Sequence, residues 1–382
     1  MNIGELLLSV FGGLQFTWAN AIMLAIGAGL IALAVVKEYE PVLLLPIGFG
    51  CILANLGMSV YNEESFLKVL YDAGIQTELF PLLIFIGVGA MIDFRPLLAQ
   101  PKMVLLGAAG QFGIFGALIL ATLLGFPLNE AASIGVIGAI DGPTAIFVTS
   151  KLAPELLGPI AVAAYSYMSL VPIIQPPIMK LMTTRKERLI RMEYAPRPVS
   201  NRTVVAFPIV VTIAISLLAP AAAPLIAALM LGNLLKESGV VERLNKAAQN
   251  EIINITTLFL GLAIGATMTA EKFLYDPATG FQFRTLGIMV LGLLAFILDT
   301  IAGLTFGKIM SFFSGGKINP LIGACGISAF PMAGRLSARA ALDEDPDNFI
   351  LMHAMGSNTA GQLGSVIAGG VLLAIVSKML GM

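Results

Sequence analysis

Residues 137–144 read Ile-Gly-Ala-Ile-Asp-Gly-Pro-Thr, and they interrupt an apolar segment that extends from residue 130 to residue 152. Asp141 is a carboxylate in a segment that otherwise suits a lipid bilayer, where such residues are rare and usually functional. The Gly-Pro pair that follows it disfavours a continuous helix. We therefore predict a broken or re-entrant helix with Asp141 at the break.

The composition indicates that this segment belongs to a membrane protein. Of the 382 residues, 57% are hydrophobic and 12% are charged, and the charged fraction is about half that of a soluble domain. The apolar residues fall into blocks of about 20, the length that spans a bilayer. The predicted fold is an all-α polytopic membrane protein. The apolar segments cover residues 17–36, 41–57, 79–94, 102–126, 130–152, 156–182, 203–219, 221–236, 252–270, 284–313, 317–341 and 350–380.

The composition also excludes several kinds of site. The net charge of −1 provides no basic surface for nucleic acid. Cys51 and Cys325 lie in separate apolar segments, and His353 is the single histidine, so neither a disulfide framework nor a metal cluster is expected. No GxxxxGK[ST] motif is present, so ATP does not drive this chain.

The charged loops predict how the chain is threaded through the membrane. The loop 183–202 is strongly basic and should face the cytoplasm, as should the basic loop 95–102, whereas the acidic stretch 61–78 should face outward. Both basic loops lie on the same side only if one of the segments 130–152 and 156–182 does not cross. Segment 130–152 is the candidate, because it contains the break at Asp141. The same parity makes segment 317–341 re-entrant from the cytoplasmic side.

The two halves of the sequence resemble each other. Residues 86–92, IGVGAMI, match residues 262–268, LAIGATM, and both Asn55 and Asn233 end an apolar run upstream. Each half would contain five crossings and one broken or re-entrant helix, and an odd number of crossings inverts the second copy. This is the plan of secondary transporters, whose ion sites lie near the midplane where broken helices meet.

The predicted organisation follows from this match. The first repeat covers residues 1–182 and includes the N-terminal helix, the basic cytoplasmic loop covers 183–202, and the second, inverted repeat covers 203–382. The two repeats together make about ten crossings.

Asp141 is the strongest candidate ligand for an ion. The break frees backbone carbonyls, Thr144 adds a hydroxyl, and hard cations such as Na⁺ prefer oxygen ligands. An alternative is that Asp141 caps the helix that begins at Gly142, because Asp is a common N-cap residue before Pro. The two roles are compatible, and the depth of the carboxylate favours the ion site.

The second half offers neutral oxygens in corresponding places. Asn319 begins the second broken segment, Ser328 lies in its middle, and Asn358 lies early in the last segment. Ser328 alone would fit ordinary packing of small residues between helices. Because its segment is the repeat partner of the one with Asp141, we predict that these residues help to form cation sites.

Two tyrosines in the first half are further candidates. Tyr165 is equally compatible with an anchor at the membrane interface. Tyr167 is two residues deeper, and its hydroxyl could be a ligand or a proton donor.

Charged residues in the second half carry open alternatives. Arg335 and Arg339 could hold a carboxylate, or they could be a signal for cytoplasmic orientation. Asp299 could pair with Lys308 or with a partner chain.

These motifs resemble those of a known family, the β subunits of the sodium-pumping, biotin-dependent decarboxylases of oxaloacetate, methylmalonyl-CoA and glutaconyl-CoA. The resemblance covers essentially the whole chain after the first helix. It is carried by Gly138-Ala139-Ile140-Asp141-Gly142-Pro143-Thr144, Asn319-Pro320-Leu321-Ile322-Gly323, Gly326-Ile327-Ser328-Ala329-Phe330-Pro331-Met332 and Asn358-Thr359-Ala360-Gly361-Gln362.

The resemblance implies a reaction and its partners. A carboxyltransferase subunit moves CO₂ to biotin on a carrier subunit, and the β subunit decarboxylates the carboxybiotin, consumes a proton and exports Na⁺. It also implies a small single-span membrane subunit, a homo-oligomer, and a place in the bacterial inner membrane.

Residue roles are implied as well. Asp141 matches the acid that binds Na⁺ and exchanges it for a proton, and Tyr167 matches a hydroxyl contributor to the reaction. Arg335, with Arg339 nearby, would meet the carboxybiotin. The remaining Na⁺ ligands would be Asn319, Ser328 and Asn358.

The residue patterns without the resemblance leave two alternatives. Inverted repeats and a buried Asp fit a stand-alone secondary transporter, such as a Na⁺/H⁺ antiporter, equally well. A passive membrane anchor for a soluble enzyme would use its buried polar residues only for packing. The acid or acyl-CoA that is decarboxylated is left open, because that chemistry lies on another chain.

Overall fold

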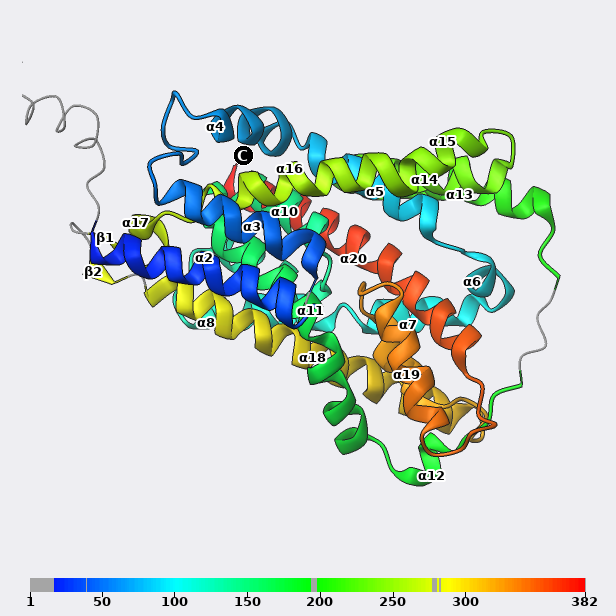
Figure 1. Cartoon of the computed structure of the whole chain (residues 1–382). Helices are drawn as coiled ribbons and strands as arrows, with labels where there is room; N and C mark the ends of the chain where they lie inside the picture. Colours follow the sequence, from blue (N-terminus) through cyan, green and yellow to red (C-terminus); the bar gives the residue numbers. More distant parts are fainter. Residues whose placement is uncertain (1–16, 39, 194–197, 277–279, 282, 382) are drawn as a thin grey trace, which may run out of the picture.

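The computed structural model describes residues 17–38, 40–193, 198–276, 280–281 and 283–381, which fold almost entirely as helices (Figure 1). Strands in this part of the chain are limited to the antiparallel pair β1 Tyr275–Asp276 and β2 Gly280–Phe281. The prediction of an all-α fold is confirmed.

The first half of the chain forms a run of helices with several short segments. Its short segments are the π-helix η1 Asp72–Gln76 and the 3₁₀ turns η2 Pro101–Met103, η3 Ile137–Ala139 and η4 Pro154–Leu156. The α-helices are α2 Trp18–Val36, α3 Pro41–Ala54, α4 Phe66–Tyr71, α5 Leu79–Met91, α6 Arg95–Ala99, α7 Val104–Ala109, α8 Phe112–Leu123, α9 Leu128–Val136, α10 Gly142–Leu152 and α11 Leu157–Met182.

The second half has a similar order of elements. It includes the π-helix η6 Ala248–Ile252 and the 3₁₀ helix η7 Pro320–Gly326. The α-helices are α12 Arg185–Arg188, α13 Asn201–Leu218, α14 Ala223–Ser238, α15 Glu242–Ala247, α16 Ile253–Gly265, α17 Ala270–Phe273, α18 Phe283–Phe313, α19 Met332–Leu342 and α20 Leu351–Leu380.

The described helices include six that are long and apolar enough to cross a membrane, or up to eight if each of two bent pairs counts as one span. Apolar side chains cover their outer surface, as on α13, where Leu217 is 77% and Leu218 is 81% exposed. Such a surface suits lipid, and helices satisfy their own backbone hydrogen bonds there. The chain is therefore a multi-pass membrane protein, while the number of about ten crossings stays a prediction.

The helix breaks lie where proline and glycine predict them. Segment 130–152 divides into α9, η3 and α10, and Ile140 between them has a left-handed backbone with φ of 52°. Segment 317–341 divides into η7 and α19. Both segments are broken as predicted, and the re-entrance of segment 317–341 stays a prediction.

A third break, between α7 and α8 at Gly110 and Gln111, was not predicted. No proline marks it. A Cβ at Gly110 would lie 2.3 Å from the backbone of Gly326, so the break lets the first half approach η7 at backbone distance. Only a contact distant in sequence accounts for this feature.

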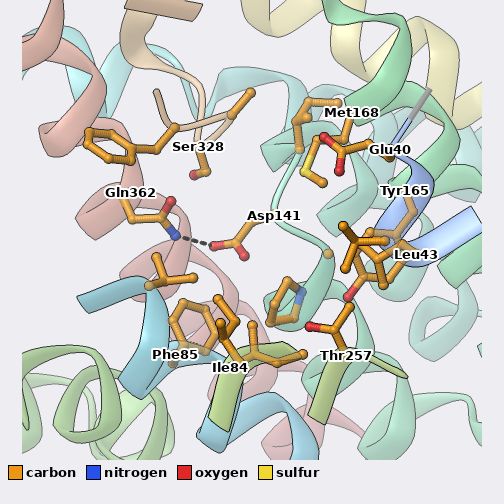
Figure 2. Close-up of a pocket in the computed structure, with 18 of the residues that line it drawn as sticks. Glu40, Leu43, Ile84, Phe85, Asp141, Tyr165, Met168, Thr257, Ser328 and Gln362 are labelled. Atoms are coloured by element: carbon orange, nitrogen blue, oxygen red, sulfur yellow. Dashed lines mark hydrogen bonds between the residues drawn. The ribbon is translucent and has the colours of Figure 1, made fainter. Parts of the chain in front are cut away.

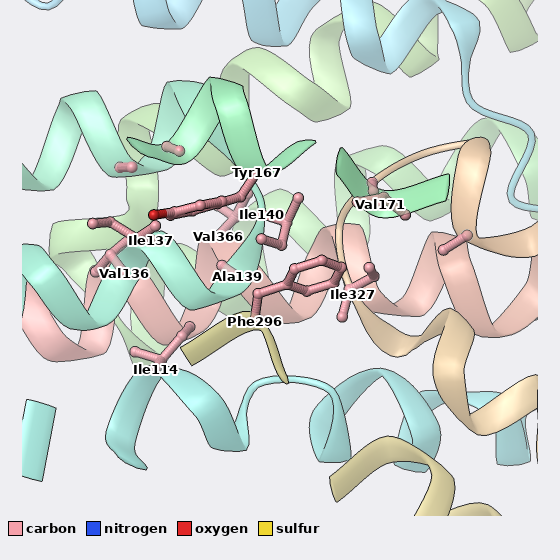
Figure 3. Packing of buried hydrophobic residues seen from close by; sticks show 14 of the residues in the cluster. Ile114, Val136, Ile137, Ala139, Ile140, Tyr167, Val171, Phe296, Ile327 and Val366 are labelled. Carbon is pink, nitrogen blue, oxygen red and sulfur yellow. The ribbon is translucent and has the colours of Figure 1, made fainter. Parts of the chain in front are cut away.

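The two broken segments meet in the core. Ser328 N donates to the Ala139 carbonyl at 3.1 Å, which joins the break after η7 to the break after η3. Figure 3 shows Ile140, Phe296 and Ile327 packed around this junction. The packing places Asp141, which follows Ile140, near the middle of the molecule.

Corresponding elements of the two halves pack reciprocally. Helix α3 packs against α16, and α14 packs against α5. Asn55 Nδ2 donates to the Met268 carbonyl at 2.8 Å, and Asn233 Nδ2 donates to the Ile92 carbonyl at 3.1 Å. Met268 and Ile92 occupy the same place in the sequence match, so the contacts agree with a repeat. The inversion and the repeat boundaries remain predictions.

The basic loop docks on the loop between α19 and α20, and residues 194–197 of it lie outside the described residues. Arg188 pairs with Glu344 at 2.6 Å, and Arg191 pairs with Asp345 at 2.6 Å. The hydrogen bond from Arg188 lowers the pKa of the Glu344 carboxyl. This contact therefore stabilises the docked loop at neutral pH and weakens as the pH falls through the lowered pKa.

Of the two alternatives for Asp299, pairing with Lys308 is wrong. Lys308 Nζ pairs with Glu187 at 3.2 Å, not with Asp299. Asp299 is fully buried and accepts a hydrogen bond from the backbone N–H of Gly113, at the start of α8. The N-terminus of a helix carries a partial positive charge. The Asp299 carboxylate therefore finds a favourable partner at the start of α8 and does not pair with Lys308 of α18.

Candidate functional site

Asp141 is the N-cap residue of α10, and its side chain is only 4% exposed. Thr144 N lies 3.5 Å from Asp141 Oδ1, so the capping role is confirmed. The same residue can carry a second role, because its other oxygen points away from the helix end toward α20 (Figure 2).

Asp141 Oδ2 is surrounded by donors from both halves of the chain. It accepts from Thr144 Oγ1 at 2.8 Å, from Gln362 Nε2 at 3.0 Å and from Ser365 Oγ at 2.7 Å. Hydrogen bonds to an ionised carboxylate stabilise the charged form against the cost of burial. The arrangement can hold a negative charge deep in the protein.

A cavity of about 260 Å³ lies in front of this carboxylate, and we call it the Asp141 chamber. It has room for several water molecules or a partly hydrated ion. Figure 2 shows Gln362 and Ser328 on one side of it and Tyr165 on the other. The polar residues that line the chamber are Glu40, Asp141, Tyr165, Asn254, Thr257, Ser328 and Gln362.

Asn358 lies close to Ser328, but it is not among the residues that line the chamber. Ser328 lines it, and its hydroxyl donates to the Gly361 carbonyl at 3.1 Å. Asn358 Nδ2 lies 3.1 Å from the Cys325 carbonyl and 2.7 Å from the Ile327 carbonyl, which fixes the amide orientation. Asn358 Oδ1 is buried without a hydrogen-bond partner among the described residues, so it is available as a ligand.

Asn319 lies at the opposite end of η7 from Ser328. Its Nδ2 donates to the carbonyls of Arg188 and Ile190, each at 2.9 Å, and its Oδ1 accepts from Leu321 N. These contacts cap η7 and fasten it to the basic loop. The structure thus does not bring Asn319 to Asp141, and its role as a Na⁺ ligand remains a prediction.

The two tyrosines face different parts of the core. Tyr165 is 2% exposed, lines the chamber and lies so close to Gly142 that a Cβ there would lie 2.1 Å from its ring. The Tyr167 hydroxyl instead donates to the Met289 carbonyl on α18, and Figure 3 shows its ring beside Ile137. A role for Tyr167 in the reaction stays a prediction.

Arg335 and Arg339 lie on the exposed face of α19. Arg335 lines a second cavity, of about 390 Å³, which shares Met91 and Phe330 with the Asp141 chamber. Arg339 is not among the residues around that cavity. In the described part of the chain neither arginine forms an ion pair, so Arg335 is an available positive charge beside the chamber.

Four polar residues that line the chamber or bond to Asp141 were missing from the predicted ligands. Gln362 lies inside a quoted motif, and Ser365 follows it by one helical turn, but polar residues in a glycine-rich helix usually serve packing. Tyr165 was set aside for Tyr167. Glu40 lies in a short loop between two apolar segments, where a charged residue attracts no notice.

The site suits a hard monovalent cation chemically. A carboxylate, a serine hydroxyl and an unpartnered amide oxygen are the oxygen donors that Na⁺ prefers. They come from both broken segments and from α20, so a movement between the halves would change them together. A proton and a metal ion would compete for Asp141, because each neutralises the same buried charge.

Comparisons with known proteins agree with this geometry. The family profile described as "Na+-transporting oxaloacetate decarboxylase beta subunit" matches residues 19–376. The chain is 54% identical to the methylmalonyl-CoA decarboxylase subunit beta of Veillonella parvula, over 96% of both chains. It is 53% identical to the glutaconyl-CoA decarboxylase subunit beta of Acidaminococcus fermentans, over 96% of this chain and 95% of the relative. It is 47% identical to the oxaloacetate decarboxylase beta chain of Klebsiella pneumoniae, over 94% and 96%.

Proposed function

Because the chain belongs to the family of Na⁺-transporting oxaloacetate decarboxylase beta subunits, we propose that it decarboxylates carboxybiotin and couples this reaction to Na⁺ export. The chain is a membrane subunit of a decarboxylase sodium pump. None of the comparisons supports the alternative of a stand-alone secondary transporter.

One observation carries the coupling mechanism. Asp141 is buried between the halves, with Oδ2 held by donors from α10 and α20 and a cavity in front of it. Two small cations, Na⁺ and H⁺, can each neutralise this carboxylate, but not at the same time. Binding of Na⁺ therefore releases a proton inside the protein.

The released proton balances the reaction. In carboxybiotin the bond between the ureido nitrogen and the carboxyl carbon breaks, CO₂ leaves, and the nitrogen takes up one proton. We propose that Arg335 binds the carboxylate of the incoming group, since its guanidinium lies unpaired beside the chamber. Arg339, one turn further on α19, would add to the positive potential at that mouth.

The other predicted residues have different roles in the proposal. Ser328 and Asn358 supply neutral oxygens to Na⁺. The place of Ser328 in the chamber wall and the unpartnered Oδ1 of Asn358 support these roles. Asn319 holds η7 against the basic loop and so positions Ser328 at the other end. Tyr167 acts in the reaction only after its hydroxyl leaves the Met289 carbonyl.

The partners follow from the same proposal. The protein works with a biotin carrier, a carboxyltransferase and a small single-span subunit, as a homo-oligomer in the bacterial inner membrane. Within the family we favour an acyl-CoA as the original carboxyl donor. The alignments with the two acyl-CoA decarboxylase subunits extend over 367 and 365 residues, whereas the alignment with the Klebsiella chain extends over 422 and must contain insertions relative to the 382 residues here.

The test is carboxybiotin decarboxylation by the complete complex in proteoliposomes, with and without Na⁺. We expect Na⁺ to stimulate the wild-type rate and to be transported. Asp141→Asn should lower the Na⁺-stimulated decarboxylation rate and the rate of Na⁺ transport by about 100-fold, which corresponds to about 2.7 kcal/mol. The reason is that an amide neither carries the charge nor exchanges a proton.

Asp299→Asn is the matched control. Asp299 is equally buried, but it accepts from Gly113 N and does not line the chamber. The amide oxygen can keep that hydrogen bond, so Na⁺ stimulation should persist. Full Na⁺ stimulation in Asp141→Asn would contradict the proposed function and favour a passive anchor.

A further inference from the structure

Two cavities adjoin the Asp141 chamber on different sides. One, of about 390 Å³, shares Met91 and Phe330 with the chamber and contains Arg335. The other, of about 420 Å³, shares Glu40 and Met332 with it. Each of these cavities therefore borders the chamber and offers a candidate approach to it.

The two approaches differ in charge. The acid beside Arg335, Asp93, lies 3.5 Å from Arg95, which leaves Arg335 as the unpaired charge of that cavity. The other cavity contains Glu38, Glu40 and a single lysine, Lys37. One mouth thus favours anions and the other favours cations.

Glu40 is the acid that reaches the chamber itself, since it lines both cavities. Figure 2 shows Glu40 on the side of the chamber across from Gln362, with Met168 and Tyr165 nearby. No hydrogen bond or ion pair to its carboxylate forms within the described part of the chain. A partly buried carboxylate without a partner is available to a cation.

The backbone at Glu40 supports a role beyond local structure. Its φ of 36° and ψ of 57° place it in the left-handed region, which glycine and asparagine adopt far more easily than glutamate. It is the N-cap residue of α3, but its side chain makes no capping hydrogen bond. Strain of this kind persists where the rest of the structure holds a residue in place for its function.

We infer that Glu40 is the first ligand that Na⁺ meets on its route to Asp141. The carboxylated biotin approaches separately, past Arg335. The inference rests on the proposed function, which requires both ions at one chamber. An acid at the mouth concentrates cations and repels the biotin carboxylate. Separate routes let Na⁺ and the anionic group occupy the chamber together.

The test is the Na⁺ dependence of decarboxylation by the reconstituted complex. Glu40→Gln should raise the Na⁺ concentration for half-maximal stimulation about tenfold, with the maximal rate and the KM for the carboxylated carrier nearly unchanged. Glu38→Gln is the comparison variant, because Glu38 lines the same cavity as Glu40 but does not line the chamber. It lowers the negative charge of the mouth without removing the proposed ligand, so its shift in Na⁺ dependence should be much smaller than that of Glu40→Gln.

A second variant separates function from folding. Glu40→Asn relieves the left-handed strain, so its Tm should equal or exceed that of the wild type while its Na⁺ dependence shifts as in Glu40→Gln. Unchanged Na⁺ dependence in both variants, with Asp141→Asn inactive, would overturn this inference and leave the proposed function standing. Equal increases in the Na⁺ concentration for half-maximal stimulation and in the KM for the carboxylated carrier would also overturn it. Na⁺-stimulated activity in Asp141→Asn would instead reject the proposed function.

Discussion

At the scale of single residues, the central problem is how a membrane protein stabilises one buried carboxylate. Asp141 obtains donors from its own helix through Thr144 and from α20 through Gln362 and Ser365. Hydrogen bonds to an ionised group are stronger than neutral ones. They offset part of the cost of burying the charged form, for which Na⁺ and a proton would compete.

Ser365→Ala removes one of these donors with little change in volume. We expect a loss of about 1.5 kcal/mol from the ionised form of Asp141, which raises the apparent Kd for Na⁺ roughly tenfold at neutral pH. Isothermal titration calorimetry of the purified complex with Na⁺ measures this apparent Kd. Ser377→Ala, a serine further along α20 without a contact to Asp141, should bind Na⁺ like the wild type, and equal affinities in both variants would show that Ser365 does not support the carboxylate.

Some residues of this site can be predicted from the sequence and others cannot. Asp141 stands out because a single acid at a Gly-Pro break in an apolar segment is costly to bury and is usually kept for function. Tyr165 and Tyr167 differ by about 200° around α11, and the sequence does not say which face meets the chamber. The position of Glu40 at the chamber depends on a loop conformation that no local sequence pattern predicts.

At the scale of elements, apolar length and proline position predicted most of the helices and both broken segments. The break between α7 and α8 could not be predicted, because it depends on the contact of Gly110 with Gly326 across the fold. The polar stretches 61–78 and 237–251 are also partly helical, as α4, η1, α15 and η6. Packing against neighbouring helices outweighs their polarity.

The reciprocal helix contacts predict one sensitive position. A Cβ at Gly89 of α5 would lie 1.9 Å from the Leu229 carbonyl of α14, so Gly89→Ala must separate these helices. We expect a loss of about 1–3 kcal/mol, seen as a lower Tm of the detergent-solubilised protein. Gly29→Ala in α2, where a Cβ meets nothing within 4 Å, should leave Tm unchanged or higher. A Gly89→Ala protein as stable as Gly29→Ala would argue against this close contact.

At the scale of the whole molecule, transport requires that the chamber open to the two sides of the membrane in turn. Exporting one Na⁺ against ~100 mV costs about 2.3 kcal/mol, which a permanently open path would dissipate. The pairs α3 with α16 and α14 with α5 join the two halves, and residues of α3, α5 and α16 also line the chamber. The inversion of the repeats stays a prediction, because it depends on which loops face which side of the membrane.

Competition between Na⁺ and a proton for Asp141 can be measured as Na⁺ binding to the purified complex at a series of pH values. Below the pKa of the carboxyl, the apparent Kd for Na⁺ should rise about tenfold for each unit of pH decrease, because the proton must leave before Na⁺ binds. Asp141→Asn should bind Na⁺ weakly at every pH. A wild-type Kd that does not change with pH, or an Asp141→Asn protein that keeps both the affinity and its pH dependence, would contradict the account.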